Sequence, residues 1–100
     1  MSSPKLPVIL SPEAQEDYAD IQSYTLQTYG QEQWERYESR IAETLDLLSE
    51  HYHTGTGRAE LPPDVRVFPV ERHCIFYRVT TDAVHIARIL HSRMDVRRHF

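Results

Sequence analysis

One hundred residues, 40% of them hydrophobic, suffice for one compact domain over residues 1–100 but not for two. The formal net charge of −4 argues against nonspecific binding to nucleic acid, because that affinity depends on many Lys and Arg contacts with phosphates. The single cysteine, Cys74, excludes an internal disulfide and suits a reducing compartment. No apolar run approaches the roughly 20 residues of a membrane span, and the first residues lack the features of a signal peptide. We therefore expect a cytoplasmic protein that makes no contact with a membrane.

The charge is distributed unevenly along the chain. Up to Glu60 there are 11 acidic residues against 4 basic ones, a net charge of −7, whereas from Leu61 onward 4 acidic residues face 7 arginines, a net charge of +3. The closing stretch ARILHSRMDVRRHF (87–100) ends in a basic tail that only Asp95 opposes. Three interpretations are open: a nuclease site, a surface that docks on a protein target, and a solvated tail without a specific role.

A helical hairpin is predicted in the first half, after a short strand at 5–10. Ser11 is a suitable N-cap, Pro12 suits the first helical position, and Gly30 can end the helix. A second amphipathic helix follows the turn at Gly30 and runs to about residue 48. The apolar stripes of the two helices step by three or four residues and comprise Ala14, Tyr18, Ile21 and Thr25 in the first helix and Trp34, Tyr37, Ile41, Leu45 and Leu48 in the second.

The second half is predicted to form strands. The segments 65–70, 73–80 and 83–90 are rich in β-branched and aromatic residues, and the loop before them carries two glycines and two prolines. The order β-α-α-β-β-β with short connections predicts an α+β fold in which the helical hairpin packs on one face of an antiparallel sheet. On the other face we expect a shallow concave surface floored by Arg78 and Arg88.

Two leucines lie off the helical stripes. Leu26 is about 120° from the stripe of the first helix and Leu47 about 110° from that of the second, at 100° per residue. Tyr24 flanks the first stripe. These residues are either scattered exposed apolar side chains, which are common, or a groove for an amphipathic segment of a partner.

The pattern SPEAQEDYADIQSY…YG, followed by a second helix, FYRV and VHIARILHSRMDVRRHF, resembles the RelE/ParE superfamily of type II toxin-antitoxin toxins. The closing ILHSRMDVRRHF is similar to the ParE branch in particular. The resemblance implies a growth-inhibiting toxin held in a hetero-oligomer by a cognate ParD-like antitoxin, which would also be its only route to operator DNA. It implies DNA gyrase as the target, bound so that replication is blocked, and no cofactor. RelE-like relatives instead cut messenger RNA on the ribosome.

A ribonuclease needs an acid, a base and cationic groups close together. Arginine can stabilise a phosphate but is a poor proton carrier, because its pKa stays above about 12. His91 is then the plausible acid or base, with Glu71 or Tyr77 as a second partner. No histidine or cysteine spacing matches a metal site. The catalytic candidates under the nuclease hypothesis are Arg78, Arg88, His91 and Arg93.

The basic tail is predicted to act by binding rather than by catalysis. Arginine beside apolar side chains is the composition of protein-binding hot spots, and Met94, Val96 and Phe100 supply the apolar component. Alternatively, Arg93 and Arg97 line one face of a frayed helical turn. The predicted sites are target-binding residues Arg88, His91, Arg93, Met94, Arg97 and Arg98, and antitoxin-binding residues Tyr24, Leu26 and Leu47, with no metal and no cofactor.

Overall fold

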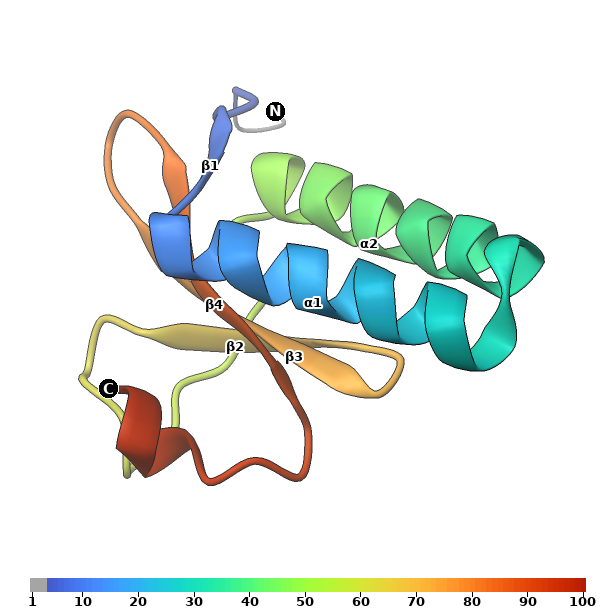
Figure 1. The fold of residues 1–100 in the computed structure, drawn as a ribbon. Coiled ribbons are helices and arrows are strands. Elements are labelled where there is room, and N and C mark those ends of the chain that lie inside the picture. The colour runs from blue at the N-terminus through green and yellow to red at the C-terminus, as the bar shows by residue number, and fades with distance from the viewer. Residues whose placement is uncertain (1–3) are drawn as a thin grey trace.

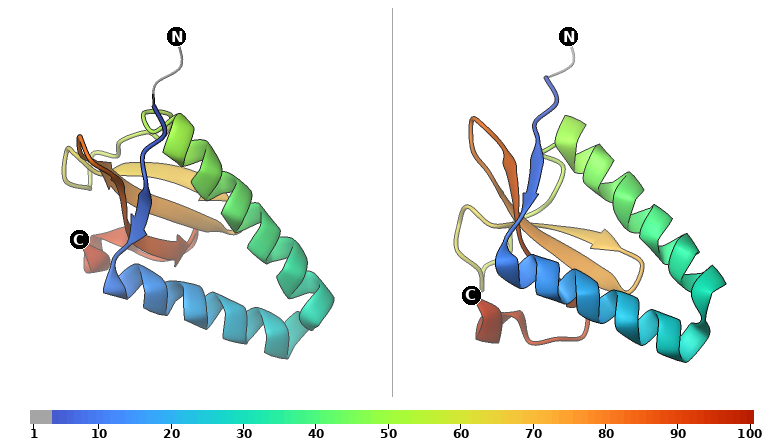
Figure 2. Two further views of the ribbon diagram at one scale, coloured as in Figure 1. Left: turned by 90° about the horizontal axis from the view of Figure 1, so that it is seen from above. Right: turned by 45° about the horizontal axis from the view of Figure 1, so that its top comes forward.

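The computed structural model describes residues 4–100, and within them the predicted α+β fold is confirmed. Both helices lie side by side over one face of a four-stranded sheet, and the C-terminal segment lies beyond the opposite face (Figure 1 and Figure 2). In chain order the elements are β1 (Val8–Leu10), α1 (Pro12–Tyr29), α2 (Gln31–Glu50), β2 (Arg66–Val70), β3 (His73–Val79), β4 (Val84–His91) and the 3-10 helix η1 (Val96–His99).

The sheet has the order β1-β4-β3-β2. Strands β2, β3 and β4 pair antiparallel, as their short connections predict. Strand β1 instead pairs parallel with β4, with Val8 opposite Val84. The expectation of a wholly antiparallel sheet is therefore wrong at this edge. A parallel pair requires a long connection, and here the two helices and two strands between β1 and β4 provide it.

Helix α1 begins and ends where its capping residues predict. The Ser11 hydroxyl accepts a hydrogen bond from the Ala14 backbone N–H at 3.0 Å, and Pro12 occupies the first helical position. At the other end the Gly30 N–H donates to the carbonyls of Thr25 and Leu26. Gly30 has a φ of 89°, a conformation that side-chain-bearing residues rarely adopt. One glycine thus ends α1 and lets α2 start at the next residue.

The sheet carries a hydrophobic cluster on each face. The main cluster joins the predicted helical stripes to Ile75, Tyr77 and Ile86 of the sheet. The second cluster lies on the opposite face and includes Phe76, which is 1% exposed, together with loop residues and η1. The expected concave floor of Arg78 and Arg88 is therefore wrong, because apolar side chains from the loop and the tail cover this face. The members of the second cluster are Leu61, Val65, Val67, Cys74, Phe76, Leu90 and Val96.

Candidate functional site

A bulge in β4 determines where its arginine lies. Phe76 pairs with Arg88 while Tyr77 pairs with Ile86, so Ala87 is an extra residue on β4. The bulge places Arg88 opposite Phe76, whereas Ile89 joins the main cluster under the helices.

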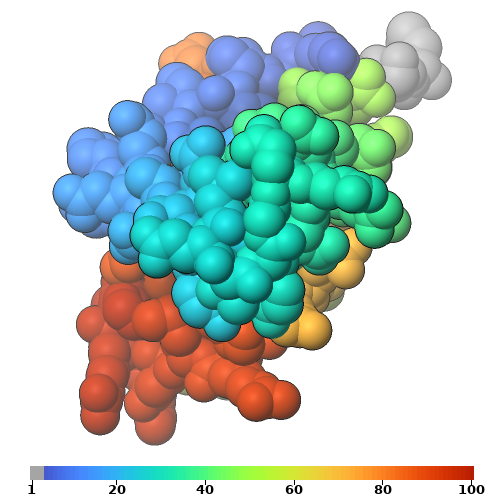
Figure 3. All heavy atoms as spheres, turned by 45° about the vertical axis from the view of Figure 1, so that its right-hand side comes forward, coloured from blue at the N-terminus to red at the C-terminus, as the bar shows by residue number. Residues whose placement is uncertain are grey.

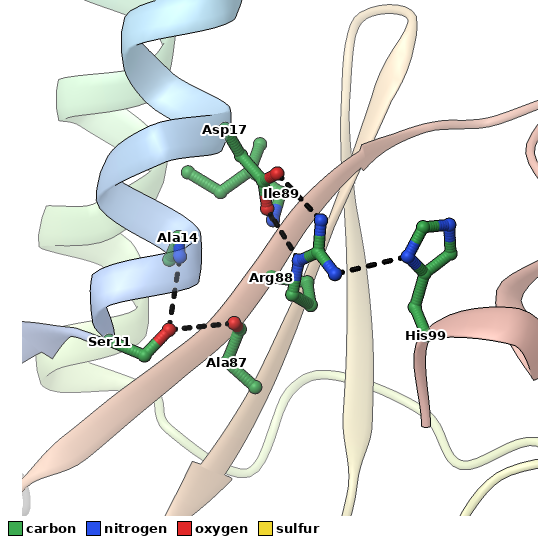
Figure 4. Close-up of polar contacts among 7 residues, drawn as sticks. All are labelled: Ser11, Ala14, Asp17, Ala87, Arg88, Ile89 and His99. Carbon is green, nitrogen blue, oxygen red and sulfur yellow. Dashed lines mark hydrogen bonds and ion pairs between the residues drawn. The ribbon is translucent and has the colours of Figure 1, made fainter.

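Asp17 of α1 binds the edge of β4 beyond the residues that pair with β1. Its carboxylate accepts two hydrogen bonds from the Arg88 guanidinium, each of 2.8 Å, and one from the Ile89 backbone N–H at 2.9 Å (Figure 4). The side chains of Asp17 and Arg88 are only 11% and 22% exposed. This partly buried bidentate pair raises the pKa of Arg88. It also fixes α1 against the strand that leads into the basic tail.

The tail is anchored to the sheet rather than frayed. The Arg88 guanidinium also donates a hydrogen bond of 3.0 Å to Nδ1 of His99 (Figure 4). This nitrogen must carry no proton to accept the bond. Val96 is 8% exposed within the second cluster, and the Phe100 ring lies 5.3 Å from that of Phe76. Two points on η1 and the final residue therefore hold the backbone of the tail in one place.

Four of the six predicted target-binding residues are exposed on this anchored tail: Arg93, Met94, Arg97 and Arg98. Arg97 pairs with Asp95 at 3.2 Å, while Arg93 and Arg98 form no ion pair with any of residues 4–100. The segment projects as one corner of the molecule below the helices (Figure 3). The other two residues differ: Arg88 is engaged by Asp17, and His91 is half-buried.

The four candidates of the nuclease hypothesis do not converge. Arg78 lies opposite His85, and its guanidinium donates to Asp64 at 2.9 Å. His91 is six residues further along β4 than His85, which corresponds to about 20 Å in a strand. Arg88 is already held by a carboxylate. An acid, a base and free cationic groups are therefore not gathered at one point among these residues.

The three predicted antitoxin contacts do not form one groove. Leu26 is half-buried and packs against the main cluster, so less of its side chain is exposed than was expected. Tyr24 is 62% exposed, and its ring lies 6.4 Å from that of Tyr29, beside the turn at Gly30. Leu47 is 38% exposed but follows Gly30 by 17 residues, or about 25 Å of helix. The two exposed residues thus lie at opposite ends of the hairpin.

Sequence reasoning missed a pocket between the turn end of the hairpin and the β2–β3 turn. We call it the arginine pocket, because its rim carries Arg36 and Arg40 of α2 and Arg72 of the turn. Its volume is about 350 Å³, and Tyr29 and Tyr37 form part of its wall. Arg36 and Arg40 belong to a helix whose other charges are all acidic, so no basic run in the sequence marks them.

His73 connects the arginine pocket to the tail. It lines the pocket, contacts the Tyr37 hydroxyl through Nδ1, and stacks edge-on with His91 at 5.3 Å between ring centroids. Burial, reinforced by repulsion from His91, lowers the pKa of His73 to about 4. Burial likewise raises the pKa of Tyr37 to about 12, so the hydroxyl stays protonated. The positive charge of this region at neutral pH therefore comes from its arginines.

Acidification should destabilise the fold through His73. In the unfolded chain His73 has the ordinary histidine pKa of 6.5, whereas in the folded chain its pKa is about 4. The unfolded state therefore binds a proton more readily between these values, so the free energy of unfolding is highest above about pH 6.5 and falls as the pH drops toward 4. At about pH 5 we expect the free energy of unfolding to be about 1 kcal/mol lower than at neutral pH. This is less than the full difference in pKa would give, because the ring is partly exposed. Urea unfolding of wild type and His73→Gln at about pH 7 and pH 5 measures it. An equal pH dependence in both proteins would contradict this assignment.

Residues 4–100 show neither a metal site nor a membrane span. No three His, Cys, Asp or Glu side chains among them are grouped so as to hold a metal ion. Neither long helix in this part of the chain is apolar enough to cross a membrane. Cys74 is buried as a free thiol in the second cluster.

Comparison with known proteins identifies the family. A family model described as the ParE toxin of the type II toxin-antitoxin system parDE matches residues 8–96. The chain belongs to the ParE toxin family. Toxin ParE1 of Mycobacterium tuberculosis is 33% identical to it over 92 residues, which cover 91% of this chain and 94% of the relative. Toxin ParE1 of Caulobacter vibrioides is 34% identical over 93 residues, covering 93% and 96%.

Structural comparison agrees with the observed fold. A solved chain from the chromosomal ParDE TA system of P. aeruginosa has a TM-score of 0.74, and the match covers 89% of this chain and 98% of that one. At 23% sequence identity this likeness supports the fold alone. The predicted membership of the ParE branch of the RelE/ParE superfamily is confirmed by the family match and the two curated toxins.

Proposed function

We propose that this ParE-family toxin inhibits DNA gyrase in the cytoplasm by binding it, without catalysing a reaction, and that a cognate ParD-like antitoxin neutralises it. Family membership supports the toxin-antitoxin part of the proposal. The observation that carries the binding mechanism is the anchored tail, which presents Arg93 and Arg98 without carboxylate partners beside exposed Met94. A preorganised backbone with unpaired arginines suits an acidic protein surface, because less entropy is lost on docking.

In this proposal Arg88 and His91 position the tail instead of contacting the target. Asp17 and His99 already occupy the Arg88 guanidinium, and Nδ1 of His91 accepts a hydrogen bond from the Arg93 backbone N–H at 3.2 Å. Antitoxin contact is assigned to Tyr24 and Leu47 as two separate points. An antitoxin that reaches both must extend along the hairpin, which suits a flexible segment. Operator DNA would be reached only through the antitoxin.

Charge reversal on the tail tests the target surface. Arg93→Glu and Arg98→Glu, singly and together, should weaken inhibition of gyrase supercoiling by at least about tenfold, because each places a carboxylate where the target is expected to present one. Both residues are exposed, so thermal unfolding should not change. Truncation after Leu90 is a poorer test, because it removes Val96 and uncovers Phe76. Titration of purified toxin into a plasmid supercoiling reaction gives the measurement.

Lys5→Glu is the matched control, because it changes a positive charge to a negative one at an exposed site away from the tail. Lys5 pairs with Glu50, the last residue of α2, at 3.6 Å. The substitution should leave inhibition unaltered. Equal loss in all variants would point to net charge rather than to the tail. Wild-type toxin that leaves gyrase untouched at micromolar excess but cuts messenger RNA on translating ribosomes would refute the proposal in favour of the RelE-like activity.

A further inference from the structure

We propose that the arginine pocket receives an acidic side chain of the ParD-like antitoxin, which thereby covers the base of the target-binding tail. This inference rests on the proposed function, because it takes the antitoxin as the partner. It goes beyond that function by naming the contact: a carboxylate held by Arg72 and Arg40 between the two tyrosines of the wall.

The dimensions of the pocket suit a side chain. About 350 Å³ lies near the lower end of the range for ligand sites and accommodates one or two amino-acid side chains. Tyr29 offers an exposed ring, and the Tyr37 hydroxyl is directed to His73 and to the Val70 carbonyl at 3.2 Å. The rim is thus cationic while the wall is aromatic, a combination that fits a carboxylate with an apolar neighbour.

Of the arginines on the rim, one has no carboxylate partner in the described part of the chain and another is paired with a glutamate of the toxin itself. Arg72 is exposed and forms no ion pair within residues 4–100. Arg40 pairs with Glu71 at 3.1 Å, and Glu71 has a φ of 54°, an unusual value for a residue with a side chain. Glu71 therefore stands where an incoming carboxylate would bind. We expect the antitoxin carboxylate to take Arg72 directly and to compete with Glu71 for Arg40.

The surroundings favour an acidic peptide over nucleic acid. The first sixty residues carry a net charge of −7, and Glu32 and Glu35 lie on the same helix as Arg36 and Arg40. A phosphate backbone would bring many negative charges against this acidic hairpin. A single carboxylate on a peptide can enter the pocket without that repulsion.

The arginine pocket lies beside the base of the tail, so a chain bound there could neutralise the toxin. The Ser92 backbone N–H donates to the Arg72 carbonyl at 2.9 Å, and the rings of His73 and His91 stack. Figure 3 shows the turn of the hairpin forward, with the C-terminal segment beneath it and the β2–β3 turn beside it. A chain seated in the pocket lies against the point where the tail leaves the sheet. It would therefore hinder approach of a large target to Arg93.

Reversing the charge of Arg72 provides the test. The probe is the protein encoded by the reading frame beside this toxin, purified and titrated into wild-type, Arg72→Glu, Glu71→Gln and Arg78→Glu toxin by calorimetry. We expect Arg72→Glu to weaken binding by about 30-fold or more and Glu71→Gln to tighten it about threefold, because the competing carboxylate is gone. Arg78→Glu makes the same change of charge at the other end of β3 from Arg72, where no antitoxin contact is assigned, and should bind like wild type. A Glu→Lys or Asp→Lys substitution at one acidic position of the antitoxin should restore binding to Arg72→Glu.

The outcomes separate this inference from the proposed function. If wild-type toxin forms no complex with the adjacent protein, the partner itself is wrong and both proposals lose it. If wild type binds and Arg72→Glu binds equally well, only the pocket inference is overturned. It is also overturned if Arg72→Glu weakens gyrase inhibition by free toxin while antitoxin affinity is unchanged, since the pocket would then belong to the target surface.

Discussion

Asp17→Asn should lower the free energy of unfolding by about 3 to 4 kcal/mol, a large effect for a substitution that changes almost no volume. The carboxylate satisfies three donors at once: two from Arg88 and the Ile89 backbone N–H. Removing one partner of a buried ion pair leaves an uncompensated charge, which typically costs about 3–5 kcal/mol. Urea unfolding of the purified proteins, followed by circular dichroism, measures the difference.

Glu32→Gln is the control for Asp17→Asn. It breaks a pair with Arg36 of the same 2.8 Å length, but the side chains of Arg36 and Glu32 are 71% and 81% exposed. Exposed pairs contribute little, so we expect a change within about 0.5 kcal/mol. Similar losses in the two variants would show that ion pairing as such, and not the burial of Asp17, determines the effect.

Asp17→Asn should also weaken the proposed inhibition of gyrase. Arg88 carries the contact with His99, so a guanidinium released from Asp17 no longer holds η1 in a fixed position. The exposed arginines would then sample many positions, and docking would lose the advantage of preorganisation. At a temperature where Asp17→Asn remains folded, gyrase inhibition should therefore be weaker than that of wild type.

Local signals predicted most of the fold. Ser11, Pro12 and Gly30 mark helix boundaries through contacts within a few residues, which depend little on the rest of the chain. The spacing of apolar residues likewise identified both buried stripes. The direction of β1 was mispredicted because pairing between residues 8–10 and 84–86 depends on the path of the whole chain. Leu26 lies off the predicted stripe but still packs partly on the core, because a helix in a hairpin contacts both the sheet and its neighbour and its buried face is wider than one stripe.

The site was predicted less completely than the fold. The exposure of Arg93, Met94, Arg97 and Arg98 follows from a polar, charged terminus. Asp17 could not be distinguished from other acidic residues of α1, because its role depends on a strand edge 71 residues away. The bulge at Ala87 shows in the sequence only as a spacing of three residues between Ile86 and Ile89, where an unbroken strand would alternate every two. The arginine pocket combines residues from α2 and a hairpin turn, so only the folded arrangement reveals it.

Gly55→Ala should be the second strongly destabilising substitution, lowering the free energy of unfolding by about 3 kcal/mol. A Cβ at Gly55 would lie 2.5 Å from the Tyr77 hydroxyl oxygen and 2.8 Å from its ring. Tyr77 is fully buried and its hydroxyl accepts a hydrogen bond from the Gly55 N–H at 2.8 Å, so neither group can move without loss. Overpacking and a disrupted buried hydrogen bond combine. Thermal and urea unfolding measure the change.

The close contact itself is tested by a matched glycine and a second substitution. Gly57 has open space within 4 Å of its would-be Cβ, so Gly57→Ala should be neutral or slightly stabilising. Tyr77→Phe removes the oxygen nearest the new methyl group and alone should cost about 1–2 kcal/mol. If the contact is the cause, Gly55→Ala combined with Tyr77→Phe will be less destabilised than the sum of the two single changes. Strict additivity would instead mean that the Tyr77 ring does not set the shape of this loop.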